Sequence, residues 1–93
     1  MLPGAPKPAA ELTDTASGRQ ILLSTNAPGI QVYTGNFLEG VAGKGGAKHC
    51  KHQSVCLETQ TYPNSVNEEA FPQPWLQPGE QYEHLMVYEF RVA

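Results

Sequence analysis

The sequence predicts an all-β fold with long loops and little helix, and three observations support this prediction. Glycine (9) and proline (8) together make about 18% of the 93 residues, against an average near 12%, which favours turns and strands over helices. Short apolar stretches alternate with polar residues at the period of two that is typical of half-buried strands. The helical period of 3.6 residues is weak along the whole chain.

The first half of the chain contains two predicted strands. Residues 1–11 are rich in proline and alanine and are expected to be a disordered lead-in to a domain at 12–93. A strand is predicted at Gln20–Thr25, followed by a type II turn centred on Pro28 and Gly29, because proline presets φ and glycine accepts a positive φ. The next strand is predicted at Ile30–Thr34, with Gln31 and Tyr33 on one face.

Two further strands are predicted in the second half, each after a long loop. The glycine-rich and lysine-rich loop Gly35–Lys51 leads to a strand at Val55–Gln60, and the proline-rich loop Thr61–Gly79 leads to a strand at Tyr82–Val92. In the last strand one face is mostly apolar and carries Tyr82, His84, Met86, Tyr88, Phe90 and Val92. Four strands joined by loops of this length leave unpaired edges, so the sequence resembles part of a larger sheet system.

Charge, hydropathy and cysteine content limit the possible functions. Six basic and nine acidic residues give a net charge of −3, which does not support binding to nucleic acid or to an anionic membrane. No apolar run approaches the roughly 18 residues that a membrane helix needs, and no signal peptide is recognisable at the N-terminus. Two cysteines without an export signal are expected to be free thiols, which predicts a cytoplasmic location.

Three candidate sites have simpler alternative interpretations. His49, Cys50, His52 and Cys56 are the right residue types for zinc, but their spacing lacks a CxxC pair, so no metal site is expected. The stretch Gly43–Gly46 lacks the P-loop pattern and a following helix, so we interpret it as a flexible loop and not as a phosphate site. Nothing marks either thiol as activated for nucleophilic catalysis, and the alternative for both is a small buried hydrophobe.

Glu58 is the fourth candidate, because it lies in the middle of a predicted strand. Composition alone favours a carboxylate that faces solvent on the wet side of a sheet. The alternative is an acid or base in a cleft, which requires other polar groups on the same face. Gln31 and Tyr33 could supply these groups if their strand packs close to that of Glu58.

Four sequence blocks follow one another along the chain: "NAPGIQVYTGNFLEG" (Asn26–Gly40), "GKGGAKHCKH" (Gly43–His52), "VCLETQTYPNSVN" (Val55–Asn67) and "LQPGEQYEH" (Leu76–His84). Together and in this order they resemble the C-terminal part of the aldose 1-epimerase (galactose mutarotase) family. The resemblance implies a large antiparallel β-sandwich with an open sugar cleft. It also implies an enzyme that uses no cofactor and interconverts the α and β anomers of free aldoses such as galactose and glucose.

The resemblance assigns roles to two residues of this chain. It implies that Glu58 is the general base and that Gln31 contacts the sugar. The family's acid histidine is expected upstream of this stretch, and His49, His52 and His84 do not match its position. We therefore expect the chain to be inactive alone, to need a missing N-terminal portion, and to self-associate through exposed apolar faces. The alternative function is a non-catalytic carbohydrate-binding or interaction remnant of the same family.

Overall fold

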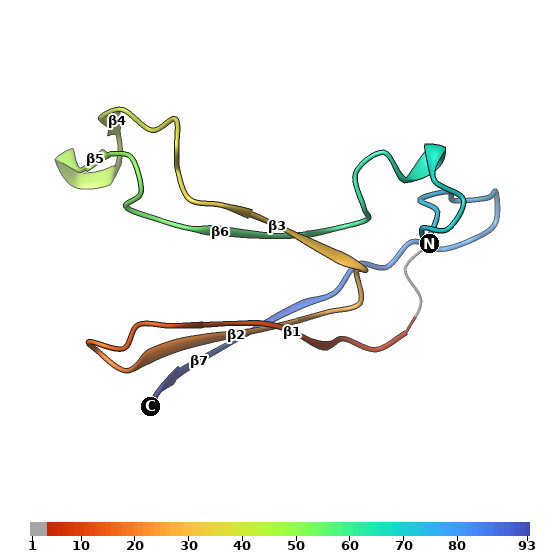
Figure 1. Cartoon of the computed structure of the whole chain (residues 1–93), viewed down its shortest axis with the longest axis horizontal. Helices are drawn as coiled ribbons and strands as arrows, with labels where there is room; N and C mark the ends of the chain where they lie inside the picture. The colour runs from red at the N-terminus through yellow and green to blue at the C-terminus, as the bar shows by residue number, and fades with distance from the viewer. Residues whose placement is uncertain (1–3) are drawn as a thin grey trace.

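The computed structural model describes residues 4–93, and almost all of its regular structure is β-strand (Figure 1). The strands are β1 (Lys7–Thr13), β2 (Arg19–Thr25), β3 (Gly29–Tyr33), β4 (Val41–Ala42), β5 (Lys48–His49), β6 (Cys56–Gln60) and β7 (Met86–Val92). Two short 3₁₀ turns, η1 (Lys44–Gly46) and η2 (Ser65–Asn67), are the only helical elements of the described residues. Every strand pair within residues 4–93 is antiparallel, so the prediction of an antiparallel all-β fold with little helix is confirmed.

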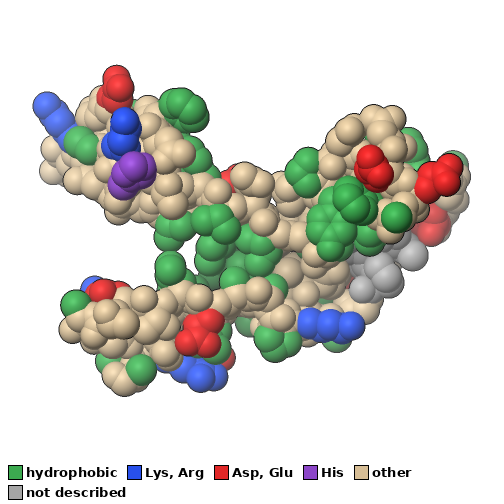
Figure 2. Space-filling model, viewed as in Figure 1, with side chains coloured by type: hydrophobic (Ala, Val, Ile, Leu, Met, Phe, Trp, Pro, Cys, Tyr) green, Lys and Arg blue, Asp and Glu red, His purple; other side chains and the backbone are tan. Residues whose placement is uncertain are grey.

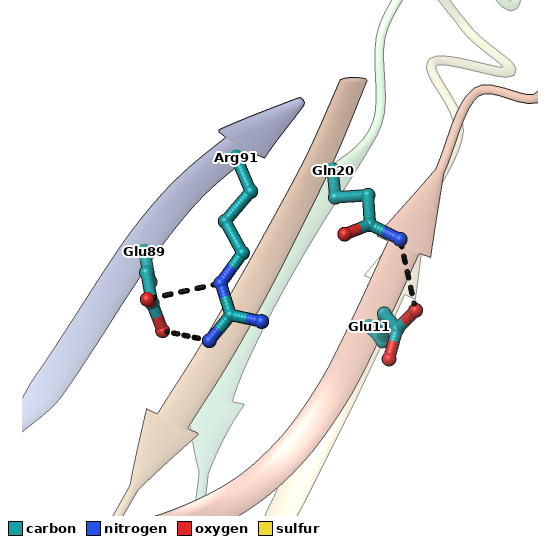
Figure 3. Close-up of polar contacts among 4 residues, drawn as sticks. All are labelled: Glu11, Gln20, Glu89 and Arg91. Atoms are coloured by element: carbon teal, nitrogen blue, oxygen red, sulfur yellow. Dashed lines mark hydrogen bonds and ion pairs between the residues drawn. The ribbon is translucent and has the colours of Figure 1, made fainter. Parts of the chain in front are cut away.

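A three-stranded sheet in the order β1-β2-β7 forms the lower layer of Figure 1. Directly opposite residues share a face of an antiparallel sheet, and this register divides the sheet into an apolar and a polar face. The apolar face carries Leu12, Ile21, Leu23, Met86, Tyr88, Phe90 and Val92. The more polar face carries Glu11, Gln20, Glu89 and Arg91 together with Leu22 and Val87. On it, Gln20 donates to Glu11 and Arg91 forms a bidentate ion pair with Glu89 (Figure 3).

Strand β1 differs from the expectation of a disordered lead-in at residues 1–11. Lys7 already pairs with Thr25, and the pairing with β2 continues to Thr13 across a bulge between Pro8 and Ala10. The sequence of β1 has little intrinsic strand preference, so its order comes from pairing with the more apolar β2. Proline is tolerated there because β1 is an edge strand with a bulge. Residues 1–3 of the predicted lead-in lie outside the described residues.

Strand β7 begins at Met86, four residues after the predicted start at Tyr82. Side chains at the end of β2 and in the following connection form hydrogen bonds to the backbone just before β7. The Thr25 hydroxyl donates to the Leu85 carbonyl at 2.8 Å, and the Leu85 N–H donates to Asn26 Oδ1 at 3.0 Å. These bonds occupy backbone groups that a longer strand would use for pairing, so the β-ladder stops at the pair Thr25–Met86.

The predicted type II turn at Pro28 and Gly29 is wrong. Gly29 is the first residue of β3 and is absent from the described glycines with positive φ. Its missing side chain matters for another reason, since two ring carbons of Tyr62 lie 3.0 and 3.1 Å from where a Cβ would be. Glycine therefore permits close packing of the Tyr62 ring on the start of β3.

The predicted loops contain more order than expected. Within Gly35–Lys51, strands β4 and β5 form a hairpin around η1, with Val41 opposite His49. Within Thr61–Gly79, the rings of Tyr62 and Phe71 make an edge-to-face contact with centroids 5.0 Å apart. Neither feature has the alternating pattern of a long strand, so periodicity did not predict them.

Strands β3 and β6 pair as a two-stranded ribbon that forms the second, upper layer of Figure 1. The two layers enclose little hydrophobic core. Leu23 is the one hydrophobic side chain within residues 4–93 that is buried, whereas Phe90 and Val92 are 73% and 77% exposed. Figure 2 shows hydrophobic side chains gathered in the open space between the layers. An open hollow of about 450 Å³ on the β1-β2-β7 sheet is lined partly by Leu12, Ile21 and Phe90. The structure thus has the apolar surfaces of a sandwich without a filled interior.

Overall dimensions support the same conclusion. The radius of gyration is 16.7 Å, whereas a compact domain of this length has about 12 Å. The accessible surface is 7099 Å², about 1,800 Å² more than a compact monomer of this mass exposes by the usual scaling. Among residues 4–93, no helix is long and apolar enough to span a membrane.

Candidate functional site

The antiparallel ribbon of β3 and β6 places Gln31 directly opposite Glu58. Cross-strand neighbours of this kind have Cβ atoms about 5 Å apart and point to the same face. Both side chains are exposed. The condition that these two strands lie side by side is therefore met, and Gln31 and Glu58 are adjacent.

Three further residues share this face, which we call the Glu58 face (Gln31, Tyr33, Cys56, Glu58 and Gln60). Tyr33 lies opposite Cys56 at one end, and Gln60 lies opposite Gly29 at the other. The Tyr33 hydroxyl accepts a hydrogen bond from the Phe37 N–H at 3.3 Å, which ties the following loop to this end of the ribbon. Gln60 received no role in the sequence analysis, although the alternation of the strand around Glu58 places it here.

The opposite face of the ribbon is directed at the β1-β2-β7 sheet. Thr59 is buried, and its hydroxyl oxygen is 2.7 Å from Nε2 of His84, just before β7. The Tyr88 hydroxyl reaches the Leu57 carbonyl at 3.5 Å. Because side chains alternate along a strand, these contacts direct Glu58 away from the apolar space between the layers.

None of the three histidines lies on the Glu58 face. His84 contacts Thr59 on the opposite face, and His52 Nε2 is 2.8 Å from Asn36 Oδ1 in the loops beyond the ribbon. The His49 ring lies against Gly43 in the β4–β5 hairpin. The structure thus brings the candidate base and the candidate sugar contact together without placing a histidine beside them.

The other sequence candidates do not assemble into a site. Within residues 4–93, no group of three or more His, Cys, Asp or Glu side chains could hold a metal ion. Cys50 and Cys56 are both free and exposed, so the interpretation of either as a buried hydrophobe is wrong. The Gly43–Gly46 stretch forms the η1 turn and leads into β5 rather than a helix, so it lacks the geometry of a P-loop.

The Glu58 face carries side chains that can form hydrogen bonds to hydroxyl groups. A carboxylate accepts hydrogen bonds or a proton from a hydroxyl, and a glutamine amide both donates and accepts. The exposure of Glu58 also matches the solvent-facing carboxylate that composition alone predicts. The interpretation of Glu58 as an acid or base is favoured over a merely solvent-facing carboxylate by its polar neighbours, because Gln31 lies opposite it and Gln60 follows it on the same face.

Comparisons with known proteins agree on one family. A family model for aldose 1-epimerase matches residues 2–89. Galactose mutarotases from Mus musculus and Homo sapiens are 49% and 48% identical to this chain over 85 residues, and an aldose 1-epimerase from Escherichia coli is 37% identical over 86 residues. Each alignment covers 90% of this chain but 25% of the relative, so the chain spans about a quarter of the length of the curated relatives it matches.

Proposed function

Because this chain belongs to the aldose 1-epimerase family, we propose that it forms part of an enzyme that interconverts the α and β anomers of free aldoses such as galactose and glucose. The observation that supports this most is the placement of Gln31 directly opposite Glu58 on an exposed sheet face. We further propose that the chain is the C-terminal segment of a larger β-sandwich. The open apolar space between its two layers supports this assignment.

Glu58 is the proposed general base. It takes the proton from the anomeric hydroxyl as the bond between C1 and the ring oxygen breaks, while an acid protonates the ring oxygen. The open-chain aldehyde then rotates about C1–C2, and ring closure on the other face of the carbonyl returns both protons. Gln31 is the proposed sugar contact, since its amide can donate to one hydroxyl and accept from another.

The proposed acid is a histidine from outside this chain. A histidine suits this role because its ordinary pKa lies near neutral pH. Two histidines of this chain are unsuitable as the acid, since His84 faces away from Glu58 and His52 contacts Asn36. A base without its acid loses about 10²–10⁴-fold in rate, so this chain alone is expected to be inactive. The proposed compartment is the cytoplasm, which the two free cysteines support.

A hybrid enzyme tests the proposal. The matched quarter of the Mus musculus galactose mutarotase is replaced by this chain, and mutarotation of fresh α-galactose is followed by polarimetry. The hybrid is expected to accelerate mutarotation, and Glu58→Gln to lower kcat by about 10²–10⁴-fold. Gln31→Ala is expected to raise KM more than it lowers kcat. Glu69→Gln, the same substitution at an exposed loop carboxylate, is the matched control and is expected to leave the rate unchanged.

Three results would contradict the proposal. A folded, active hybrid in which Glu58→Gln and Glu69→Gln have the same rate would show that Glu58 is not the base. Clear acceleration by the 93-residue chain alone would show that no outside acid is needed. A folded hybrid that binds galactose but never accelerates mutarotation would favour the non-catalytic, carbohydrate-binding alternative.

A further inference from the structure

Strand β7 leaves one of its two edges open. It pairs with β2 on one side and is the last strand of its sheet within the described residues. All seven of its residues, Met86–Val92, are exposed. Figure 3 shows β7 at the border of the sheet, with the Glu89 and Arg91 side chains on its polar face. An open edge presents a row of N–H and C=O groups that can pair with another strand.

The two edges of this sheet are unequal. Edge strand β1 carries Pro8 and a bulge between Pro8 and Ala10, and both features discourage further pairing. Strand β7 has neither proline nor glycine, and its pairing with β2 runs without a register shift from Met86 to Val92. The sheet is therefore protected on its β1 side and available on its β7 side.

We propose that the occupant of this edge is a second copy of the chain. The two β7 strands pair antiparallel about a two-fold axis that passes between Phe90 and Phe90 of the second copy. The result is a continuous six-stranded sheet in which both apolar faces lie on the same side. This inference does not depend on the proposed catalytic role of Glu58, because β7 belongs to the other sheet.

The charges on β7 select this register. With Phe90 at the axis, Glu89 lies opposite Arg91 of the second copy, and Arg91 lies opposite its Glu89, so two opposite-charge pairs form. Centring the axis on Glu89 or on Arg91 would instead place like charges opposite each other. Placing the axis between two neighbouring residues, for example between Glu89 and Phe90, would put the apolar face of one copy beside the polar face of the other, which is strongly disfavoured. Among the registers that keep the two faces apart, the one centred on Phe90 places the opposite charges of β7 against each other, so the segment is self-complementary there, as a two-fold interface requires.

The exposed surface of the chain is large enough for such an interface. The chain exposes about 1,800 Å² more than a compact monomer of its size, whereas a stable interface buries about 800 Å² per partner. Phe90 and Val92, 73% and 77% exposed, would lie at the junction of the two copies. Tyr88, whose ring stacks near that of Phe90 with centroids 6.5 Å apart, would lie opposite Val92 of the second copy.

Charge variants of the 93-residue chain test the register. Light scattering after size exclusion, at about 10–100 µM protein, is expected to give the mass of two 10.1 kDa chains for the natural sequence. Glu89→Arg alone, or Arg91→Glu alone, creates two like-charge pairs across the axis and is expected to weaken dimerisation at least about tenfold. Mixing these two variants is expected to restore a 1:1 dimer, because each cross-strand pair then has opposite charges.

The mixture separates the interface from local effects. Each single variant destroys the ion pair between residues 89 and 91 of its own chain, so restored association in the mixture can come only from contacts between chains. High salt is expected to reduce the difference between variants and natural chain. Far-UV circular dichroism verifies that each variant keeps its strands.

Three outcomes would overturn the proposal. A natural chain that stays monomeric at 100 µM would do so, and so would single variants that dimerise as tightly as the natural chain. Large aggregates that respond to neither substitution would place the contact on the apolar face rather than on the β7 edge.

Discussion

Leu23→Ala is expected to destabilise this chain more than any other truncation of an aliphatic side chain. Leu23 is 1% exposed, at the centre of the β1-β2-β7 sheet, where it pairs with Ala10 on one side and Tyr88 on the other. Truncating a buried leucine costs about 2–5 kcal/mol, from lost burial and from the cavity left behind. A domain of this length usually has about 5–14 kcal/mol of stability. With Leu23 as the one buried hydrophobic side chain of residues 4–93, this chain is expected to lie at or below the lower limit.

Phe37→Ala provides the control for this prediction. It removes a larger apolar side chain, but Phe37 is 85% exposed, so the free energy of unfolding is expected to change by less than about 0.5 kcal/mol. Urea titrations followed by far-UV circular dichroism, at one fixed protein concentration, give the two midpoints. The fixed concentration matters because dimerisation would add a concentration-dependent stability. Equal shifts for the two variants would refute the view that the sheet depends on Leu23.

Two further predictions concern the turn between β1 and β2. Gly18→Ala is expected to cost about 1–3 kcal/mol more than Gly40→Ala. Both glycines have positive φ, but only at Gly18 would a Cβ meet the Ala93 carbonyl oxygen, at 2.6 Å; equal costs in urea titrations would contradict this. The Asp14 pKa lies below its ordinary value of 3.8, chiefly because the Ser17 hydroxyl donates to its carboxylate at 2.6 Å. The stabilisation this bond gives is therefore present above pH 4 and lost as the pH falls through the lowered pKa. Ser17→Ala is expected to raise the Asp14 midpoint in a carbon-13 NMR titration, and an unmoved midpoint would exclude this cause.

The four predicted strands were recognisable because alternation is a local signal. The strands found at β2, β3, β6 and β7 fall within the predicted ranges to within one residue, apart from the late start of β7 at Met86. That start depends on hydrogen bonds of Leu85 with Thr25 and Asn26, which lie 60 and 59 residues away in sequence, and no local pattern predicts such bonds. Strand β1 was missed for a similar reason, since its partner and not its own composition orders it.

The candidate site was predictable in its parts but not in its register. Alternation alone places Glu58 and Gln31 each on a definite face of its own strand. Whether they meet depends on how β3 pairs with β6 across the 22-residue connection between Tyr33 and Cys56, and a slip of one residue would place Ile30 or Val32 opposite Glu58. The structure supplies this register. It also shows that the connection contains the β4–β5 hairpin, which shortens the effective loop between the two strands.

The two faces of the β3–β6 ribbon impose separate requirements on this protein. Thr59 and Leu57 face the space between the layers, so covering that space would stabilise the fold. Glu58 and Gln31 face the other way, so the same cover would add nothing to the proposed sugar site. A second copy paired at β7 lies at the edge of the other sheet. It would raise stability by strand pairing, without covering the space between the layers and without supplying an acid. For the 93-residue chain we therefore expect stability that rises with protein concentration, without any mutarotation activity. The hybrid enzyme is expected to gain both stability and mutarotation activity.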